Sequence, residues 1–215
     1  MKKLGIFLGI GGDERAIRRL LPNDWETDCF TWPTPHKNES LKSYCLRPEA
    51  RRMLRCDALL GFSFGALPVL ELLAEQPQKP ALLISCAIHR NELPWHLRLP
   101  GSAFFLGHCS PQMIRKAVNR FLESSSGEKA KLKGIVEGIP PELHQWAMLV
   151  SLHARYQLPP NTYRLHGESD PLFPKDRIGT SDWVPGGKHL LIRDSADEVR
   201  NWLDEKLHLI SSSYA

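Results

Sequence analysis

The stretch Ala58-Leu59-Leu60-Gly61-Phe62-Ser63-Phe64-Gly65 decides how the rest of the sequence is interpreted. An apolar run leads into a Gly-x-Ser-x-Gly pattern, and a helical pattern begins at Ala66 and ends before Pro77. The two glycines allow a sharp, strained turn between a strand and a helix, because a larger side chain there would meet neighbouring backbone. Such a turn exposes Ser63 at a helix N-terminus, whose N–H groups attract developing negative charge. The other interpretation, a glycine-rich turn with an incidental serine, stays open on this segment alone.

Short apolar runs alternate with longer helical patterns along the chain, as they do in βαβ units around a parallel sheet. We expect strands at 4–8, 28–32, 57–62, 81–84, 162–166 and 188–192. We expect helices at 13–21, with Asp13 as the N-cap, and at 48–55, 66–75, 111–122, 141–156 and 197–209. The pattern predicts an α/β fold with a mostly parallel sheet of about six strands flanked by helices.

Residues 87–160 interrupt this alternation because they contain no clear strand. An insertion of this size between alternating units is usually functional. We therefore expect a core formed by 1–86 and 161–215, with a helical lid or cap at 87–160. Large apolar side chains in the insertion would either roof a pocket or bury a small core of its own: Trp95, Phe104, Phe105, Leu106, Trp146, Met148 and Leu149.

Two further segments place polar residues beside expected strands. His166-Gly167-Glu168-Ser169-Asp170-Pro171 follows the strand at 162–166, and Gly186-Gly187-Lys188-His189 leads into an apolar run. Taken singly, Asp170 fits an Asp-Pro turn and His189 fits a surface or core histidine. Together with Ser63, however, they stand in the chain order Ser…Asp…His, and each lies at the turn end of an expected strand. That order favours a nucleophile, an acid and a base in one site.

Through these three segments the sequence resembles the α/β-hydrolase superfamily, and especially its small, single-domain bacterial carboxylesterase-like members. The resemblance runs from Leu4 to the last helix, apart from the insertion. It implies Ser63 as nucleophile, Asp170 as acid, His189 as base, and the backbone N–H groups of Ile10 and Phe64 as an oxyanion hole. The sequence departs from the family at Leu8, where a histidine is frequent, and it lacks the usual first hairpin. The second departure implies a reduced sheet.

The resemblance implies a serine hydrolase that cleaves a carboxylic ester of a small or medium acyl substrate through an acyl-enzyme. Two alternatives stay open: a thioesterase or acyl-carrier-protein ester hydrolase, and a non-catalytic ligand-binding protein of the same fold. No cofactor or metal is expected, because no His/Cys/Asp cluster has ligand spacing and the glycines at 9, 11 and 12 lack the ending of a phosphate loop. His166 is expected to hydrogen-bond a turn rather than to act as a second base.

The composition is that of an ordinary globular protein, with 215 residues, 24% charged residues and a formal net charge of +4. The basic stretches are broken by Leu, Glu and Ala, which argues against nucleic-acid binding; an acidic acyl-carrier protein is the weaker alternative partner to a small ester. Five scattered cysteines without a Cys-x-x-Cys pair favour a reducing compartment. No run approaches the roughly 18 apolar residues of a membrane span. We therefore expect a cytoplasmic protein without membrane contact.

Overall fold

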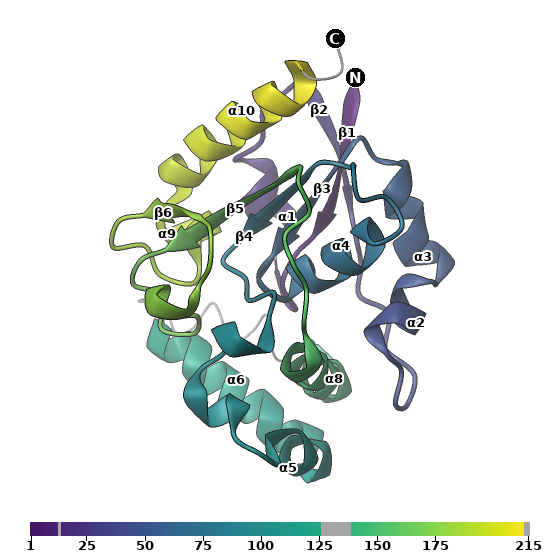
Figure 1. The fold of residues 1–215 in the computed structure, drawn as a ribbon, viewed down its shortest axis with the longest axis vertical. Coiled ribbons are helices and arrows are strands. Elements are labelled where there is room, and N and C mark those ends of the chain that lie inside the picture. Colours follow the sequence, from purple (N-terminus) through teal and green to yellow (C-terminus); the bar gives the residue numbers. More distant parts are fainter. Residues whose placement is uncertain (13, 126–138, 213–215) are drawn as a thin grey trace.

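A six-stranded sheet forms the centre of the molecule in a computed structural model, which describes residues 1–12, 14–125 and 139–212 (Figure 1). All neighbouring strands pair in parallel, in the order β2-β1-β3-β4-β5-β6. The strands are β1 (Lys2–Phe7), β2 (Trp25–Cys29), β3 (Ala58–Phe62), β4 (Ala81–Ile84), β5 (Thr162–Gly167) and β6 (Asp182–Val184). The prediction of a mostly parallel sheet of about six strands is confirmed.

Helices cover both faces of this sheet (Figure 1). The helices of the described residues are α1 (Glu14–Arg18), α2 (Leu41–Cys45), α3 (Pro48–Arg51), α4 (Ala66–Leu73), α5 (Ser102–His108), α6 (Pro111–Ser125), α8 (Pro141–His153), α9 (Leu191–Asp194) and α10 (Ala196–Ser212). Successive strand residues point to opposite faces. Leu59 thus belongs to the buried cluster that includes residues of α2, α3, α4 and α8, whereas Leu60 belongs to the one that includes residues of α1, α9 and α10. Within the described part of the chain, no helix combines the length and apolar character needed to cross a membrane.

Two of the expected strands are wrong in position. The strand expected at 28–32 lies three residues earlier, as β2, and the segment 188–192 is not a strand but a turn that leads into α9. The sixth strand is instead β6, which has only three residues with Val184 alone buried, so it carries no apolar run in the sequence. Helices α2 and α5 were not expected, and the proposed N-cap Asp13 lies outside the described residues.

The segment 87–160 contains α5, α6 and α8 together with the 3₁₀ turns η3 (Arg90–Glu92) and η4 (Trp95–Arg98). Figure 1 shows α5 and α6 beyond the carboxyl ends of the strands, and both contact α8. The start of the segment is held by a buried ion pair, in which Arg164 of β5 donates to both carboxylate oxygens of Glu92 at 2.9 and 2.8 Å. Glu92 also accepts the backbone N–H of Ile88, and Arg164 donates to the Cys86 carbonyl.

The large apolar side chains of this segment divide into two groups. Trp146 of α8 is buried in the core above the sheet, and Leu106 packs against a small cluster that contains Phe173. Phe104 and Phe105 of α5, in contrast, are 71% and 67% exposed. Burial in a core therefore applies to only some of these residues, because the two phenylalanines face away from it.

The turn between β3 and α4 packs backbone to backbone against β1. A Cβ atom built on Gly65 would lie 1.9 Å from the carbonyl oxygen of Phe7, and one built on Gly61 would lie 2.5 Å from the Cα of Ala66. Neither neighbour is a side chain that can rotate away. Glycine is therefore required here by the close approach of the backbones.

We predict that Gly65→Ala lowers the free energy of unfolding by about 3 kcal/mol or more, because β1 and the turn must separate to admit the methyl group. Gly107→Ala is the matched control, since a Cβ at Gly107 in α5 meets nothing within 4 Å. It should be neutral or stabilising by up to about 1 kcal/mol. Urea unfolding of both variants checks the prediction, and equal effects would contradict it.

Candidate active site

The strand order reverses between β1 and β3. The chain leaves β1 toward α1 on one face of the sheet and leaves β3 toward α4 on the other face. In open parallel sheets, ligands bind where the strand order reverses in this way. The turn at Gly9 and the residue Ser63 both lie at this point, and a Cβ atom on Gly9 would be 3.2 Å from the Cβ of Ser63.

Ser63 has a strained backbone at the start of the helix. Its φ of 53° lies in the left-handed region, which non-glycine residues adopt only where the surroundings require it. The short 3₁₀ turn Ser63–Gly65 (η2) then continues directly into α4. The expected strand–turn–helix is therefore present in the structure, with Ser63 partly buried at the turn.

Three side chains that are distant in the sequence form one continuous contact. Ser63 Oγ lies 2.9 Å from His189 Nε2, and His189 Nδ1 lies 2.9 Å from Asp170 Oδ2. Because a carboxylate only accepts, Nδ1 must carry the proton, and Nε2 is then free to accept the hydroxyl proton of Ser63. The structure thus brings together all three residues that the sequence pointed to.

Asp170 uses its two carboxylate oxygens for two different purposes. Oδ1 accepts the backbone N–H groups of Leu172 and Phe173 at 2.8 and 3.1 Å, which forms the expected Asp-Pro turn. Oδ2 faces the imidazole of His189. Burial raises the pKa of Asp170, but the imidazoles of His166 and His189 outweigh it, so the pKa lies well below its usual range. The carboxyl group is therefore an anion at neutral pH.

The ring of His189 is fixed by aromatic neighbours and by a tight backbone contact. Its centroid lies 6.0 Å from the ring of Phe62 and 5.3 Å from the ring of Phe173. The loop that carries it approaches the end of β5 so closely that a Cβ on Gly167 would be 2.3 Å from the Gly187 carbonyl oxygen. This contact holds the loops of Asp170 and His189 at a fixed separation.

His166 lies against Asp170, which the sequence did not indicate. Its side chain is fully buried, and Nε2 is 3.2 Å from Asp170 Oδ2, off the direction of a hydrogen bond. No bond to a turn, the role expected from the sequence, is seen in the structure. The one signal in the sequence was its place four residues before Asp170 at a strand end, which does not distinguish it from a packing residue.

The two backbone groups expected to bind an oxyanion flank Ser63. Phe64 follows it at the start of the helix, and its ring packs against Trp32 and Trp146 at 5.3 and 5.5 Å. Ile10 follows Gly9 in a turn that Gly12 N closes on the Gly9 carbonyl at 2.8 Å. Both peptide groups therefore belong to segments that adjoin Ser63.

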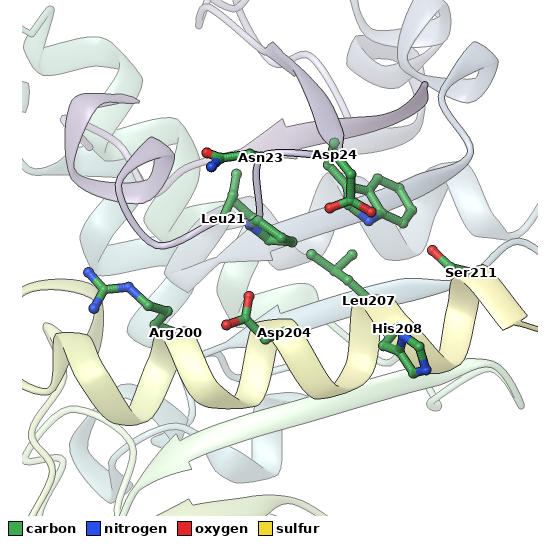
Figure 2. Close-up of a pocket in the computed structure, with 10 residues that line it drawn as sticks. Leu21, Asn23, Asp24, Arg200, Asp204, Leu207, His208 and Ser211 are labelled. Atoms are coloured by element: carbon green, nitrogen blue, oxygen red, sulfur yellow. The ribbon is translucent and has the colours of Figure 1, made fainter.

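A hollow lies at the amino ends of the strands (Figure 2). Leu21, Asn23 and Asp24 line it before β2 begins, and α10 supplies Asp204 and His208 on the other side. Since the strands are parallel, the start of β2 and the end of β3 lie at opposite ends of the sheet's strands. This hollow is therefore separate from Ser63. Over the described residues, no group of three or more His, Cys, Asp or Glu side chains is arranged to hold a metal ion.

Comparison with solved structures shows the α/β-hydrolase fold. A structure from a study of carboxylesterases of Nitrososphaera gargenis has a TM-score of 0.68 at 14% identity, covering 99% of this chain and 92% of that one. A meta-cleavage product hydrolase from Pseudomonas fluorescens has 0.67 at 15% (97% and 91%). An esterase from Thermogutta terrifontis has 0.64 at 14% (98% and 90%). No family model and no curated sequence matches the chain.

We predict that Asp170→Asn destabilises the fold by about 2 kcal/mol at pH 7 and that this difference shrinks as the pH falls. The lowered pKa of Asp170 gives stability that is present above its unfolded value, near pH 4, and is lost on acidification below it. Urea unfolding between about pH 7 and pH 3 measures the difference. The exposed Asp176→Asn is the control; a gap for Asp170→Asn that does not change with pH would refute the prediction.

Proposed function

We propose that this chain, which has the α/β-hydrolase fold, is a serine hydrolase that cleaves a carboxylic ester of a small or medium acyl substrate. The observation that carries the proposal is the continuous contact from Ser63 Oγ through His189 to Asp170, with both distances at 2.9 Å. The similar structures named for carboxylesterase and esterase activity support the reaction class.

The geometry suits acyl transfer in two halves. In the first half, His189 Nε2 takes the proton of Ser63 as the oxygen attacks the ester carbonyl, and the charge of Asp170 stabilises the imidazolium. His189 then protonates the leaving alcohol as its bond to the acyl carbon breaks. In the second half, water gives a proton to His189 and attacks the acyl carbon. As the bond to Ser63 Oγ breaks and the acid leaves, His189 returns that proton to Oγ.

We assign the oxyanion hole to the backbone N–H groups of Ile10 and Phe64. The contact distance between Gly9 and Ser63 supports this assignment, because it leaves the following peptide beside the nucleophile. The N-terminal position of Phe64 in its helix supports it further, since the helix dipole favours negative charge there. Removing one donor of such a hole typically costs on the order of a hundredfold to a thousandfold in rate.

We also propose that residues 87–160 are a cap over this site and that 1–86 and 161–215 are the core. Two contacts support the division. Trp146 of α8 packs edge-on against the ring of Phe64 beside the nucleophile. Leu106 of α5 packs against the small cluster that contains Phe173, whose ring lies 5.3 Å from that of His189. An aromatic wall this close to Ser63 favours a short acyl group over a long one.

We propose that the protein works in the cytoplasm. Its substrate would be a freely diffusing ester. The cysteines support a reducing compartment, since all five are unpaired in the structure and Cys45, Cys56 and Cys86 are buried. A carrier-bound acyl group is the alternative substrate form.

We predict that a fluorophosphonate probe labels the protein and that Ser63→Ala abolishes the labelling. Ser85→Ala is a matched control, because Ser85 also ends a strand with a positive φ, of 49°, but is fully buried. It should still be labelled. Intact mass spectrometry measures the adduct, and a folded wild-type protein that takes no label would refute the proposal in favour of a binding protein.

We predict that His189→Ala lowers kcat/KM on a p-nitrophenyl ester by about a thousandfold or more, since no other base contacts Ser63 among the described residues. His166→Ala should keep most of the activity at the pH optimum. The reverse order of effects would show that the base has been assigned to the wrong histidine.

We predict that p-nitrophenyl esters of graded length, from acetate to laurate, give the highest kcat/KM with the shorter acyl chains. Each buried methylene can contribute only about 0.8 kcal/mol, so the preference should fall gradually. Acyl thioesters assayed in parallel test the alternative; a clear preference for thioesters would replace the ester assignment.

A further inference from the structure

The carboxylate of Asp170 is faced by a second imidazole. His189 Nδ1 and His166 Nε2 lie 2.9 and 3.2 Å from the same oxygen, Oδ2. The side chains of His166 and Asp170 have no exposed surface, so water does not separate them. Because an anionic oxygen repels a nitrogen lone pair, His166 must present Nε2–H to it.

His166 is held in this place by the sheet. It lies in β5 opposite Trp183 of β6, and its ring packs against Trp183 and Phe173 at 5.7 and 6.2 Å. An apolar side chain would fill such a space without the cost of burying an imidazole. The polar ring therefore needs another reason to be there, and the oxygen of Asp170 is the group that it faces.

The other groups around Asp170 do not replace this contact. The Cys86 thiol is buried near it, and burial raises the pKa of Cys86 to about 11, so the thiol stays neutral. The charge of Arg164, farther along β5, is paired with Glu92. Among the described residues, the side chains that face the charge of Oδ2 at neutral pH are thus His166 and His189.

We propose that His166 is a positioning residue, which holds Oδ2 of Asp170 toward His189 and sets the pH at which the site becomes active. The inference rests on the proposed function. The positive end of the Nε2–H bond lies close to Oδ2, although it is not directed at it as in a hydrogen bond. Its electrostatic attraction offsets part of the carboxylate's charge, so less of that charge stabilises protonated His189. Without that N–H group, more of the Asp170 charge would favour the protonated form of His189. The acid limb of kcat/KM would then move to higher pH.

The test compares His166→Phe, which keeps the ring but removes the donor, with His166→Gln, whose amide can place a donor near the position of Nε2. We expect His166→Phe to move the acid limb of kcat/KM upward by about 0.5 to 1 pH unit. On the plateau it should stay within about threefold of the wild type. His166→Gln should restore the limb. Thermal unfolding of each variant establishes that it is folded.

Three outcomes overturn the inference in a folded variant. An unmoved limb in His166→Phe makes the residue a packing group only. Loss of activity at every pH makes it part of the reacting centre. An equal shift in His166→Gln shows that the imidazole, rather than its donor, is responsible.

A second measurement separates this inference from the proposed function. Nitrogen-15 NMR of the His189 ring in the Ser63→Ala background follows protonation without any turnover. Adding His166→Phe should move the midpoint of that titration upward, and an unmoved midpoint would refute the inference even if esters are hydrolysed. If no ester is hydrolysed but the midpoint moves, the reaction assignment fails and the coupling between the histidines stands.

Discussion

The backbone of Gly65 lies directly against the carbonyl of Phe7, and the arrangement of the site depends on this contact. It fixes the end of β1 relative to the turn after β3, so the loop at Gly9 emerges beside Ser63. The same turn forces Ser63 into the left-handed region, where its side chain projects out of the elbow. The imidazole of His189 contacts the Ser63 hydroxyl. The loop that contains His189 packs closely, backbone to backbone, against the end of β5. Two backbone contacts thus set the distance between nucleophile and base.

The sequence predicts those parts of this arrangement that depend on local patterns of apolar, glycine and proline residues. β3 and β4 are buried on both faces, so they appear as continuous apolar runs, and Gly61 and Gly65 mark the turn between strand and helix. Pro141 stands at the start of α8 because the first turn of a helix tolerates it. Asp170 and His189 could be assigned through their order along the chain, which reflects the strand topology that brings them together.

The remaining parts depend on tertiary contacts that no local pattern encodes. β6 is a three-residue edge strand, and its pairing with β5 decides its conformation more than its own side chains do. Leu191 and Ile192 are apolar because they pack under α10, which gives a helical turn the same appearance as a strand. The contact of His166 with Asp170 depends on a turn that reverses the chain between them, so their separation in sequence carries no information about it.

The ion pair of Glu92 with Arg164 also defines where one part of the molecule ends and another begins. Glu92 belongs to the proposed cap, yet it is bonded to Arg164 of β5 and to the N–H of Ile88, so residues 88–92 are anchored to the sheet. A chimera that exchanges α5, α6 and α8 for those of another protein should therefore be joined after Glu92. A junction at 87 would leave the guanidinium of Arg164 buried without its counter-ion, and a graft that fails there would say nothing about the helices it carries.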